Sequence, residues 1–441
     1  MTSSHSLSQT TRNVGQTKSR KPWTQGCLAQ PPYQNRAHSR HPAARPQCWH
    51  APACHAIQSA LPKAEERQND FGGVFGGPII KDRTFLFFSY EGLRLRQPAT
   101  QETVVPDNAS RQQAPTAMQP FLNAYPIQNG PELGLGLAKF NASYSDPSSL
   151  DATSIRIDQA IGSRVNLFAR YNYSPSDLTQ RGPFLSTARV LSMRESVSST
   201  VQTGTLGLSQ MITRRISNEF RANYSNDRVG TTYALDNFGG AVPLPDALVF
   251  PSGYSSGEGL FQFILIGSGT YYQGKQGTDE QRQINLVDNV FVVRGSHQMK
   301  IGVDYRWLSP FSSPYTYSQL AECLGVTCSS PPCPGFAQSG TSAVAAVFAY
   351  QSDTLISTNL SLYGQDTWRI TPRLTMTYGL RWDLNTPLKG KNLANQPFTV
   401  TGLDNPPTIA LGPRGTPLYK ATYDNVAPRF GVAYLLTDKP D

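Results

Sequence analysis

The sequence of 441 residues contains no run of about 18 apolar residues, so it predicts no transmembrane helix. Only 38% of the residues are hydrophobic, and the mean hydropathy is −0.38. Long helices are not expected either, because no apolar pattern is sustained at helical spacing and the chain holds 36 Gly and 34 Pro. These absences leave open a membrane protein that crosses the bilayer with β-strands, since such strands are apolar on one face only.

Histidine and cysteine are scarce, and five of the six His and three of the six Cys lie in the first 55 residues. Cys48, His50, Cys54 and His55 lie close together, but their spacing fits no paired zinc-binding motif. The same segment is basic, yet it lacks the aromatic platform or fold motif that nucleic-acid binding needs. We therefore predict no metal site, no cofactor and no nucleic-acid partner.

The excess of positive charge is confined to this N-terminal segment. Residues 1–67 hold nine Lys or Arg against Glu65 and Glu66, which accounts for seven of the nine net positive charges. The segment is poor in aliphatic residues, shows no periodicity, and begins without the apolar core of a secretory signal peptide. We expect residues 1–68 to be a disordered or spurious basic tail, joined by a wrong start or a shifted frame to a folded body at 69–441.

Residues 69–441 contain little of the histidine that nucleophilic catalysis usually requires. A Ser or Cys nucleophile usually needs a His that takes its proton. The body contains a single histidine, His297, which is predicted to lie in a turn beside Gly295 and Ser296 and to be solvated. We therefore predict that the protein is not an enzyme and that it has no catalytic, cofactor-binding or metal-binding residues.

The most regular pattern follows Trp368 and a short turn at 369–372. Apolar and polar residues then alternate with a period of two, which predicts a strand with one apolar and one polar face, about as long as a tilted strand that crosses a bilayer. One face holds Leu374, Met376, Tyr378, Leu380, Trp382 and Leu384, and the other holds Arg373, Thr375, Thr377, Gly379, Arg381 and Asp383.

Similar patterns recur along the chain, and they predict about ten strands. We expect them near 84–96, 153–161, 164–174, 199–211, 216–227, 282–293, 297–308, 358–368, 373–385 and 425–436. The connections between them alternate between tight turns and long segments, at 97–152, 175–198, 228–281, 309–357 and 386–424. Outer-membrane barrels have short periplasmic turns and long extracellular loops, whereas a soluble sandwich has no reason to place every long loop at one end.

A Gly-rich segment at 69–80 precedes the first of these strands. The segment is predicted to be a bend rather than a phosphate-binding loop, because its glycine pairs permit positive φ and close backbone approach and Pro78 excludes a helix. The segment 69–92 resembles the start of the barrel in Oar-like TonB-dependent receptors, on the phrases Phe-Gly-Gly-x-x-Gly-Gly-Pro-Ile, Lys-Asp-x-Thr-Phe and Tyr-Glu-Gly. The resemblance continues at 363–374 and 427–434 and covers roughly residues 69–441.

The alternation predicts about ten strands, and the composition of the first segment predicts a disordered N-terminal tail. With these, the resemblance implies an all-β fold: an incomplete antiparallel transmembrane β-barrel of the outer-membrane type. It also implies a place in the outer membrane of a Gram-negative-type bacterium, contact with outer-membrane lipid, and import of a large nutrient or metal chelate with energy from the inner-membrane TonB complex. The alternative is an adhesion or secretion-associated barrel without import. Members are expected to close with about 22 strands and to carry a signal peptide, a regulatory domain and a plug. We therefore expect a fragment with two open edges.

Two further expectations concern the ends of the strands. Since the strand at 84–96 is taken as the first, whatever precedes Phe71 is expected to be periplasmic. In the long loops, one disulfide is expected among Cys323, Cys328 and Cys333, without a preferred pair, and the segment 261–266 is expected to form an extra hairpin arm.

Overall fold

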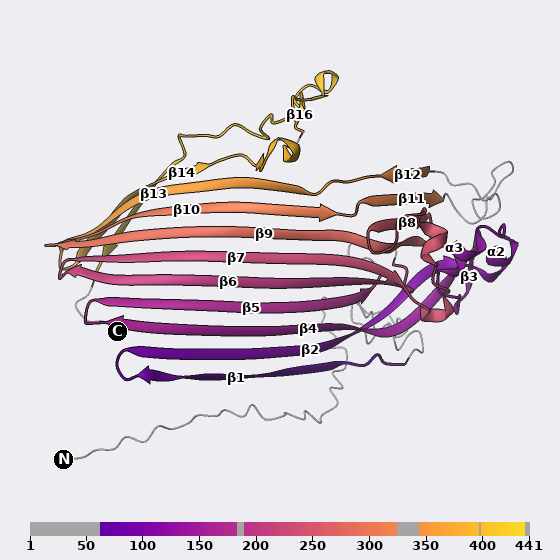
Figure 1. Cartoon of the computed structure of the whole chain (residues 1–441), viewed down its shortest axis with the longest axis horizontal. Helices are drawn as coiled ribbons and strands as arrows, with labels where there is room; N and C mark the ends of the chain where they lie inside the picture. Colours follow the sequence, from indigo (N-terminus) through magenta and orange to yellow (C-terminus); the bar gives the residue numbers. More distant parts are fainter. Residues whose placement is uncertain (1–61, 183–188, 324–343, 397, 437–441) are drawn as a thin grey trace, which may run out of the picture.

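The structure is a computed structural model, and it describes residues 62–182, 189–323, 344–396 and 398–436. One large antiparallel sheet dominates it, with the short turns at one end and a cluster of helices and short strands at the other (Figure 1). The predicted tail, including Cys48, His50, Cys54 and His55, lies almost wholly outside the described residues, as do Cys328 and Cys333. Among the described residues, no helix is long and apolar enough to cross a membrane.

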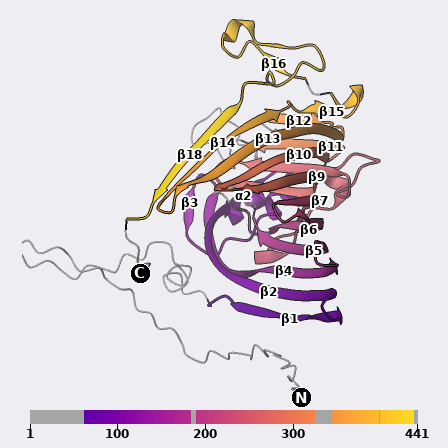
Figure 2. The same cartoon turned by 90° about the vertical axis from the view of Figure 1, so that its left-hand side faces the viewer.

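Eleven long strands follow one another along the sheet, each pairing with the next. They are β1 (Arg67–Ile80), β2 (Thr84–Pro106), β4 (Leu137–Ile161), β5 (Val165–Arg181), β6 (Met193–Thr213), β7 (Ile216–Leu235), β9 (Gly269–Arg294), β10 (His297–Pro314), β13 (Asp353–Thr371), β14 (Leu374–Asn385) and β18 (Val426–Tyr434). The sheet is curved and its edge strands β1 and β18 lie apart, so the barrel is open, as predicted (Figure 2).

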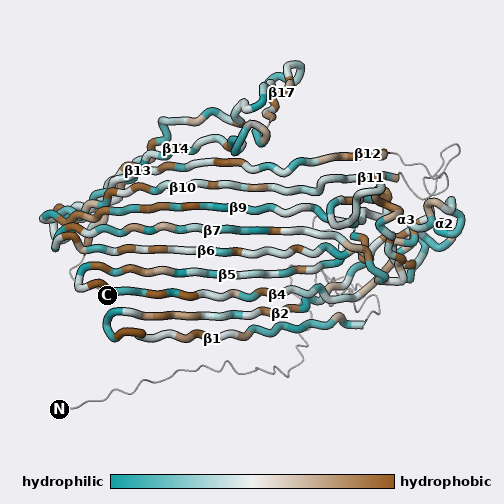
Figure 3. The backbone as a smooth tube through the Cα atoms, viewed as in Figure 1, coloured by the Kyte–Doolittle hydropathy of each residue, from teal (hydrophilic) through white to brown (hydrophobic). Residues whose placement is uncertain are grey.

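The predicted alternation sets the two faces of the sheet. In β10, Ile301 pairs in register with Val290 and Gly364, while its neighbour Gly302 pairs with Asn289 and Tyr363. Hydrophobic and hydrophilic residues are interspersed along the other long strands as well (Figure 3), and in β14 they alternate as predicted. The sheet therefore has one mainly apolar face and one mainly polar face.

All ten predicted strands are present, and their ends at the short turns agree with the prediction to within three residues. At the other end eight of the ten are longer than predicted, and β4 and β9 have 25 and 26 residues, whereas β14 and β18 are not extended there. The reason is that the apolar alternation covers only the part of each strand that faces the membrane. Beyond it the backbone hydrogen bonds continue, but the residues carry no period-two signal.

The Gly-rich segment was wrongly predicted to be a bend. It forms β1, which pairs with β2 along nearly its whole length, and its glycines do not have positive φ. A side chain on Gly72 would collide with the carbonyl oxygen of Tyr90 across the pair, whereas one on Gly73 would meet nothing within 4 Å. Glycine at position 72 therefore allows β1 and β2 to approach each other closely.

The strand β1 also corrects the predicted orientation. The tight turn Lys81–Arg83 lies at the same end as the other short turns, so Arg67 lies at the opposite end of the sheet, with the long connections. Since short turns are periplasmic in outer-membrane barrels, the chain enters β1 from the extracellular side and not from the periplasm.

The long connections contain more structure than loops were expected to hold. They include α2 (Asn108–Gln113), α3 (Gln119–Asn123), β3 (Glu132–Gly134), η1 (Phe238–Gly240), α4 (Asp246–Val249), β8 (Gly259–Leu265), β11 (Tyr317–Cys323) and β12 (Val344–Phe348). The last connection adds β15 (Lys389–Gly390), η2 (Leu393–Asn395), β16 (Val400–Thr401), η3 (Pro406–Thr408) and β17 (Ala410–Leu411). The expected hairpin at 261–266 is present, because β8 pairs antiparallel with β9.

Candidate functional site: the polar face and its cap

The polar face of the sheet carries charged side chains held by local hydrogen bonds. Arg156 donates to both carboxylate oxygens of Asp158, at 2.7 and 2.6 Å, and its guanidinium lies over the ring of Phe168. Arg381 pairs with Asp383 at 2.9 Å on the same face, in β14 near the opposite edge of the sheet. These pairs lie between the short turns and the cap, where a closed barrel would have its lumen.

Other cations on this face have no counter-ion. Arg221 and Arg306 are exposed and make no ion pair with any residue that the structure describes. Lys300 lies between two rings, with its Nζ 5.5 Å from the centre of Phe291 and 5.6 Å from that of Tyr363. A wall of this kind is wet and of mixed charge, as expected for the interior of an outer-membrane barrel.

The main apolar core lies in the long connections and not in the membrane part of the sheet. We call this cluster, with the elements that form it, the cap. Its fully buried members include Leu122, Tyr125, Leu191, Phe261, Phe263 and Tyr271. Phe140, Ala142 and Tyr144 belong to the same core and share a face of β4 with Arg156 and Asp158, since the pairing of β4 with β2 has no shift. The cap therefore covers the polar face at the extracellular end, and α2 and β3 lie within the curve of the sheet (Figure 2).

Arg111 organises the cap. This arginine of α2 is only 6% exposed, and its guanidinium donates hydrogen bonds to four backbone carbonyls: Pro106 at 3.1 Å, Leu122 at 2.6 Å, Tyr125 at 3.1 Å and Pro126 at 2.7 Å. Burial lowers the pKa of Arg111 to about 10, so it remains charged at neutral pH. A buried cation that donates hydrogen bonds to four backbone carbonyls fixes the path of the chain around it. No local pattern in the sequence marks this residue.

Further hydrogen bonds attach the cap to the strands. The Tyr125 hydroxyl donates to the carbonyl of Gly269 at 2.9 Å, and the Ser192 hydroxyl donates to that of Ala124 at 2.6 Å. The Ser268 hydroxyl donates to the carbonyl of Val104 at 2.8 Å. These bonds join residues far apart in the sequence, so the cap is one packed unit rather than a set of independent loops.

Cys323 ends β11 inside this core. Its side chain is completely buried, and its thiol forms no disulfide with any residue that the structure describes. Burial raises the pKa of the Cys323 thiol, which keeps it protonated at neutral pH. Because Cys328 and Cys333 lie outside the described residues, the predicted loop disulfide stays a prediction.

Two carboxylates interrupt the apolar face near the short turns. Asn218 donates to Asp288 at 2.6 Å. Asp366 Oδ2 lies 2.6 Å from His297 Nδ1 and accepts a hydrogen bond of 2.9 Å from the hydroxyl of Tyr378. His297 also stacks on Trp368. The prediction of a solvated turn histidine is therefore wrong in one respect: His297 follows a turn, but its side chain is tied to Asp366.

No catalytic, cofactor-binding or metal-binding residue was predicted. Among the residues that the structure describes, no group of three or more His, Cys, Asp or Glu is placed to hold a metal ion. The features that could act on a solute are instead the cap and the polar wall beneath it.

A curved antiparallel sheet with one apolar face, one wet face and all its short turns at one end is the wall of a membrane-spanning β-barrel. The family model described as an outer membrane beta barrel domain matches residues 50–440, and the chain belongs to that family. The protein is thus a β-barrel protein of the bacterial outer membrane, as the sequence predicted. The predicted boundary at residue 69 stays a prediction.

Several solved outer-membrane proteins resemble the chain. The transporter YddB from Escherichia coli is 9% identical, with a TM-score of 0.46 over 83% of this chain and 36% of that one. The ferric-catecholate import receptor Fiu from E. coli, in its open form, is 11% identical, with a TM-score of 0.41 over 86% and 53%. The copper transporter OprC is 11% identical, with a TM-score of 0.41 over 86% and 43%. The chain thus spans between about a third and a half of these structures, and no curated protein matched the sequence.

Proposed function

We propose that the chain contains the first part of the barrel of an outer-membrane receptor of the TonB-dependent type. In this proposal the whole protein binds a large nutrient or a metal chelate from outside and imports it with energy from the inner-membrane TonB complex. The resemblance of residues 69–92 to Oar-like receptors supports the class of protein. The proposal identifies the ligand only by its chemical class, a large nutrient or a metal chelate.

The observation that carries the proposal is the cap over the polar face. Recognition of a solute from outside needs a surface of fixed shape on a rigid scaffold. The cap has its own core, and Arg111 holds four of its carbonyls, so its outer surface has a defined shape. Beneath it, Arg221 and Arg306 offer unpaired charge along a wet wall, which suits a polar solute on its way through the barrel.

Uptake by cells with and without TonB tests the proposal. Cells that express the protein are offered labelled iron(III) chelates, copper(II) chelates and oligosaccharides one at a time. We expect one class to accumulate inside the cells only when both this protein and TonB are present. If solutes or surfaces are bound equally without TonB and nothing is imported, the adhesion or secretion-associated alternative replaces the proposal.

A further inference from the structure

The apolar face of the sheet is not smooth, because a groove crosses it between β4 and β9. The groove has a volume of about 470 Å³, which lies within the range of roughly 300–1,000 Å³ that small-ligand sites occupy. Its wall is almost entirely apolar. The side chains on the membrane side are Ile155, Ile157, Ala169, Tyr171, Leu206, Ala222, Tyr224 and Ile284.

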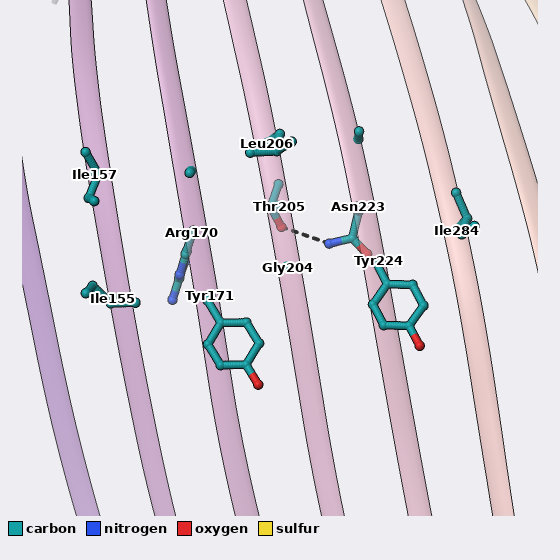
Figure 4. A pocket seen from close by; sticks show the side chains of 12 residues that line it. Ile155, Ile157, Arg170, Tyr171, Gly204, Thr205, Leu206, Asn223, Tyr224 and Ile284 are labelled. Atoms are coloured by element: carbon teal, nitrogen blue, oxygen red, sulfur yellow. Dashed lines mark hydrogen bonds between the residues drawn. The ribbon is translucent and has the colours of Figure 1, made fainter.

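A glycine forms the floor of the groove. Gly204 pairs in register with Tyr171 on one side and with Tyr224 on the other. A side chain added to Gly204 would meet nothing within 4 Å, so the space between the two tyrosines is open down to the backbone. Figure 4 shows both rings projecting in the same direction from the strands that flank Gly204. We call the open space between them the slot.

The slot continues toward the middle of the membrane. In the next row of the sheet, the small residues Ala169 and Ala222 lie on either side of Leu206. A second hollow of about 430 Å³ shares Ile157, Ala169 and Leu206 with the first one. Together the two hollows extend along β4 from Ile155 to Gln159, a length of roughly 13 Å at the strand rise.

The opposite end of the slot reaches the polar boundary of the membrane. The Tyr171 hydroxyl donates to Gln202 Oε1 at 3.0 Å. Gln202 pairs in register with Asn226, which pairs with Arg282, so a polar row crosses the otherwise apolar face just above the tyrosines. Tyrosines beside such a row mark the headgroup level on the long-loop side, which is the outer leaflet.

We propose that this groove binds one acyl chain of an outer-leaflet lipid. It is a dent in the face that contacts hydrocarbon, and it is therefore continuous with the lipid interface of the barrel. It opens at headgroup level and runs inward, and its lining on the membrane side is apolar apart from the tyrosine hydroxyls at its mouth and Gln159 at its inner end, whose Oε1 accepts a hydrogen bond from Thr84. A flexible chain of methylene groups can enter between the tyrosines, cross Gly204 and pass beside Leu206, where a rigid or polar ligand would leave space or unsatisfied groups.

Photo-crosslinking tests this site. The protein from the outer membrane is placed in phosphatidylethanolamine vesicles that contain an analogue with a diazirine in its acyl chain, and labelled residues are mapped by mass spectrometry. We expect labelling around Tyr171, Leu206 and Tyr224 to exceed that around Leu380, which lies on the apolar face outside the groove. Equal labelling at both places overturns the proposal, and so do protein–protein crosslinks through the groove in place of lipid adducts, since they indicate a second copy as the occupant.

Two matched glycine variants distinguish the effect of filling the slot from the effect of placing a large side chain elsewhere on the apolar face. Gly204→Phe fills the slot, and we expect it to abolish the excess labelling. Gly364→Phe is the control, because Gly364 also lies on the apolar face of a long strand with nothing within 4 Å of an added side chain. We expect that variant to keep the excess. Ala169→Phe blocks the second hollow and provides the same test should Gly204→Phe fail to fold. An excess that survives in a folded slot variant contradicts the proposal.

Discussion

His297 Nδ1 lies 2.6 Å from Asp366 Oδ2, although both side chains belong to the apolar face of the sheet. Asp366 is only 8% exposed, and its other oxygen is buried with no hydrogen-bond partner in the described part of the chain. The pair lies close to the short turns, where the apolar belt ends. It therefore marks the periplasmic boundary of the membrane. Each of the two side chains supplies a hydrogen-bond partner that the other would otherwise lack.

Breaking this pair from one side is expected to destabilise the sheet. His297→Leu leaves the buried carboxylate of Asp366 with one hydrogen bond fewer, which costs about 1–3 kcal/mol. The double variant His297→Leu/Asp366→Leu removes both polar groups from a lipid-facing surface, so its loss should be smaller than the sum of the two single losses. Denaturant unfolding in lipid vesicles measures all three, and strict additivity would contradict the coupling.

Arg111 is expected to hold the cap together. Arg111→Met leaves several buried carbonyls unsatisfied, and we expect a local loss of at least about 3 kcal/mol. Arg111→Lys keeps the charge but not the planar fork, so it should recover only part of that loss. Hydrogen exchange in 106–126 reports the change.

Arg94→Met is the control for this prediction. Arg94 pairs with Asp151 at 2.9 Å, but Arg94 is exposed and Asp151 is half-buried at most, so little change in the cap is expected. Unchanged protection of the cap in Arg111→Met would show that the guanidinium does not organise it.

The glycine pairs of β1 give a prediction at neighbouring positions. Gly72→Ala places a methyl group against the carbonyl oxygen of Tyr90, whereas Gly73→Ala places one in open space. We expect only the first variant to weaken the pairing of β1 with β2, with faster amide exchange in 67–80. The same exchange rate in both variants would indicate that strand approach is not what glycine provides here.

Cys323 is expected to be unreactive in the folded cap. In a chain in which the other five cysteines are replaced by serine, a maleimide at pH 8 should label Cys323 only after unfolding, because its thiol is buried and the raised pKa keeps it protonated. The ratio of labelling rates in buffer and in urea measures this. Rapid labelling of the folded protein would mean that the cap core opens readily.

The membrane part of the sheet could be predicted from the sequence because a single physical constraint, lipid on one face and water on the other, determines it. Strands such as 373–385 carry that constraint in every second residue. The β1 strand escaped prediction because its glycines have no side chains to alternate, and this error also reversed the predicted orientation of the chain before it. The cap escaped because its core joins residues such as Tyr125 and Tyr271 from different connections, without any local period. Arg111 acts through backbone carbonyls, which leave no trace in the sequence.

Accessibility along β10 tests the central claim that this sheet is a barrel wall in a membrane. Spin labels are introduced one at a time at positions 301 to 306 in the protein in lipid, and collision rates with dissolved oxygen and with a water-soluble nickel chelate are compared. Our account predicts a period of two, with Ile301, Val303 and Tyr305 exposed to oxygen and Gly302, Asp304 and Arg306 exposed to the chelate. Equal exposure of both sets to the chelate would place both faces in water and contradict it.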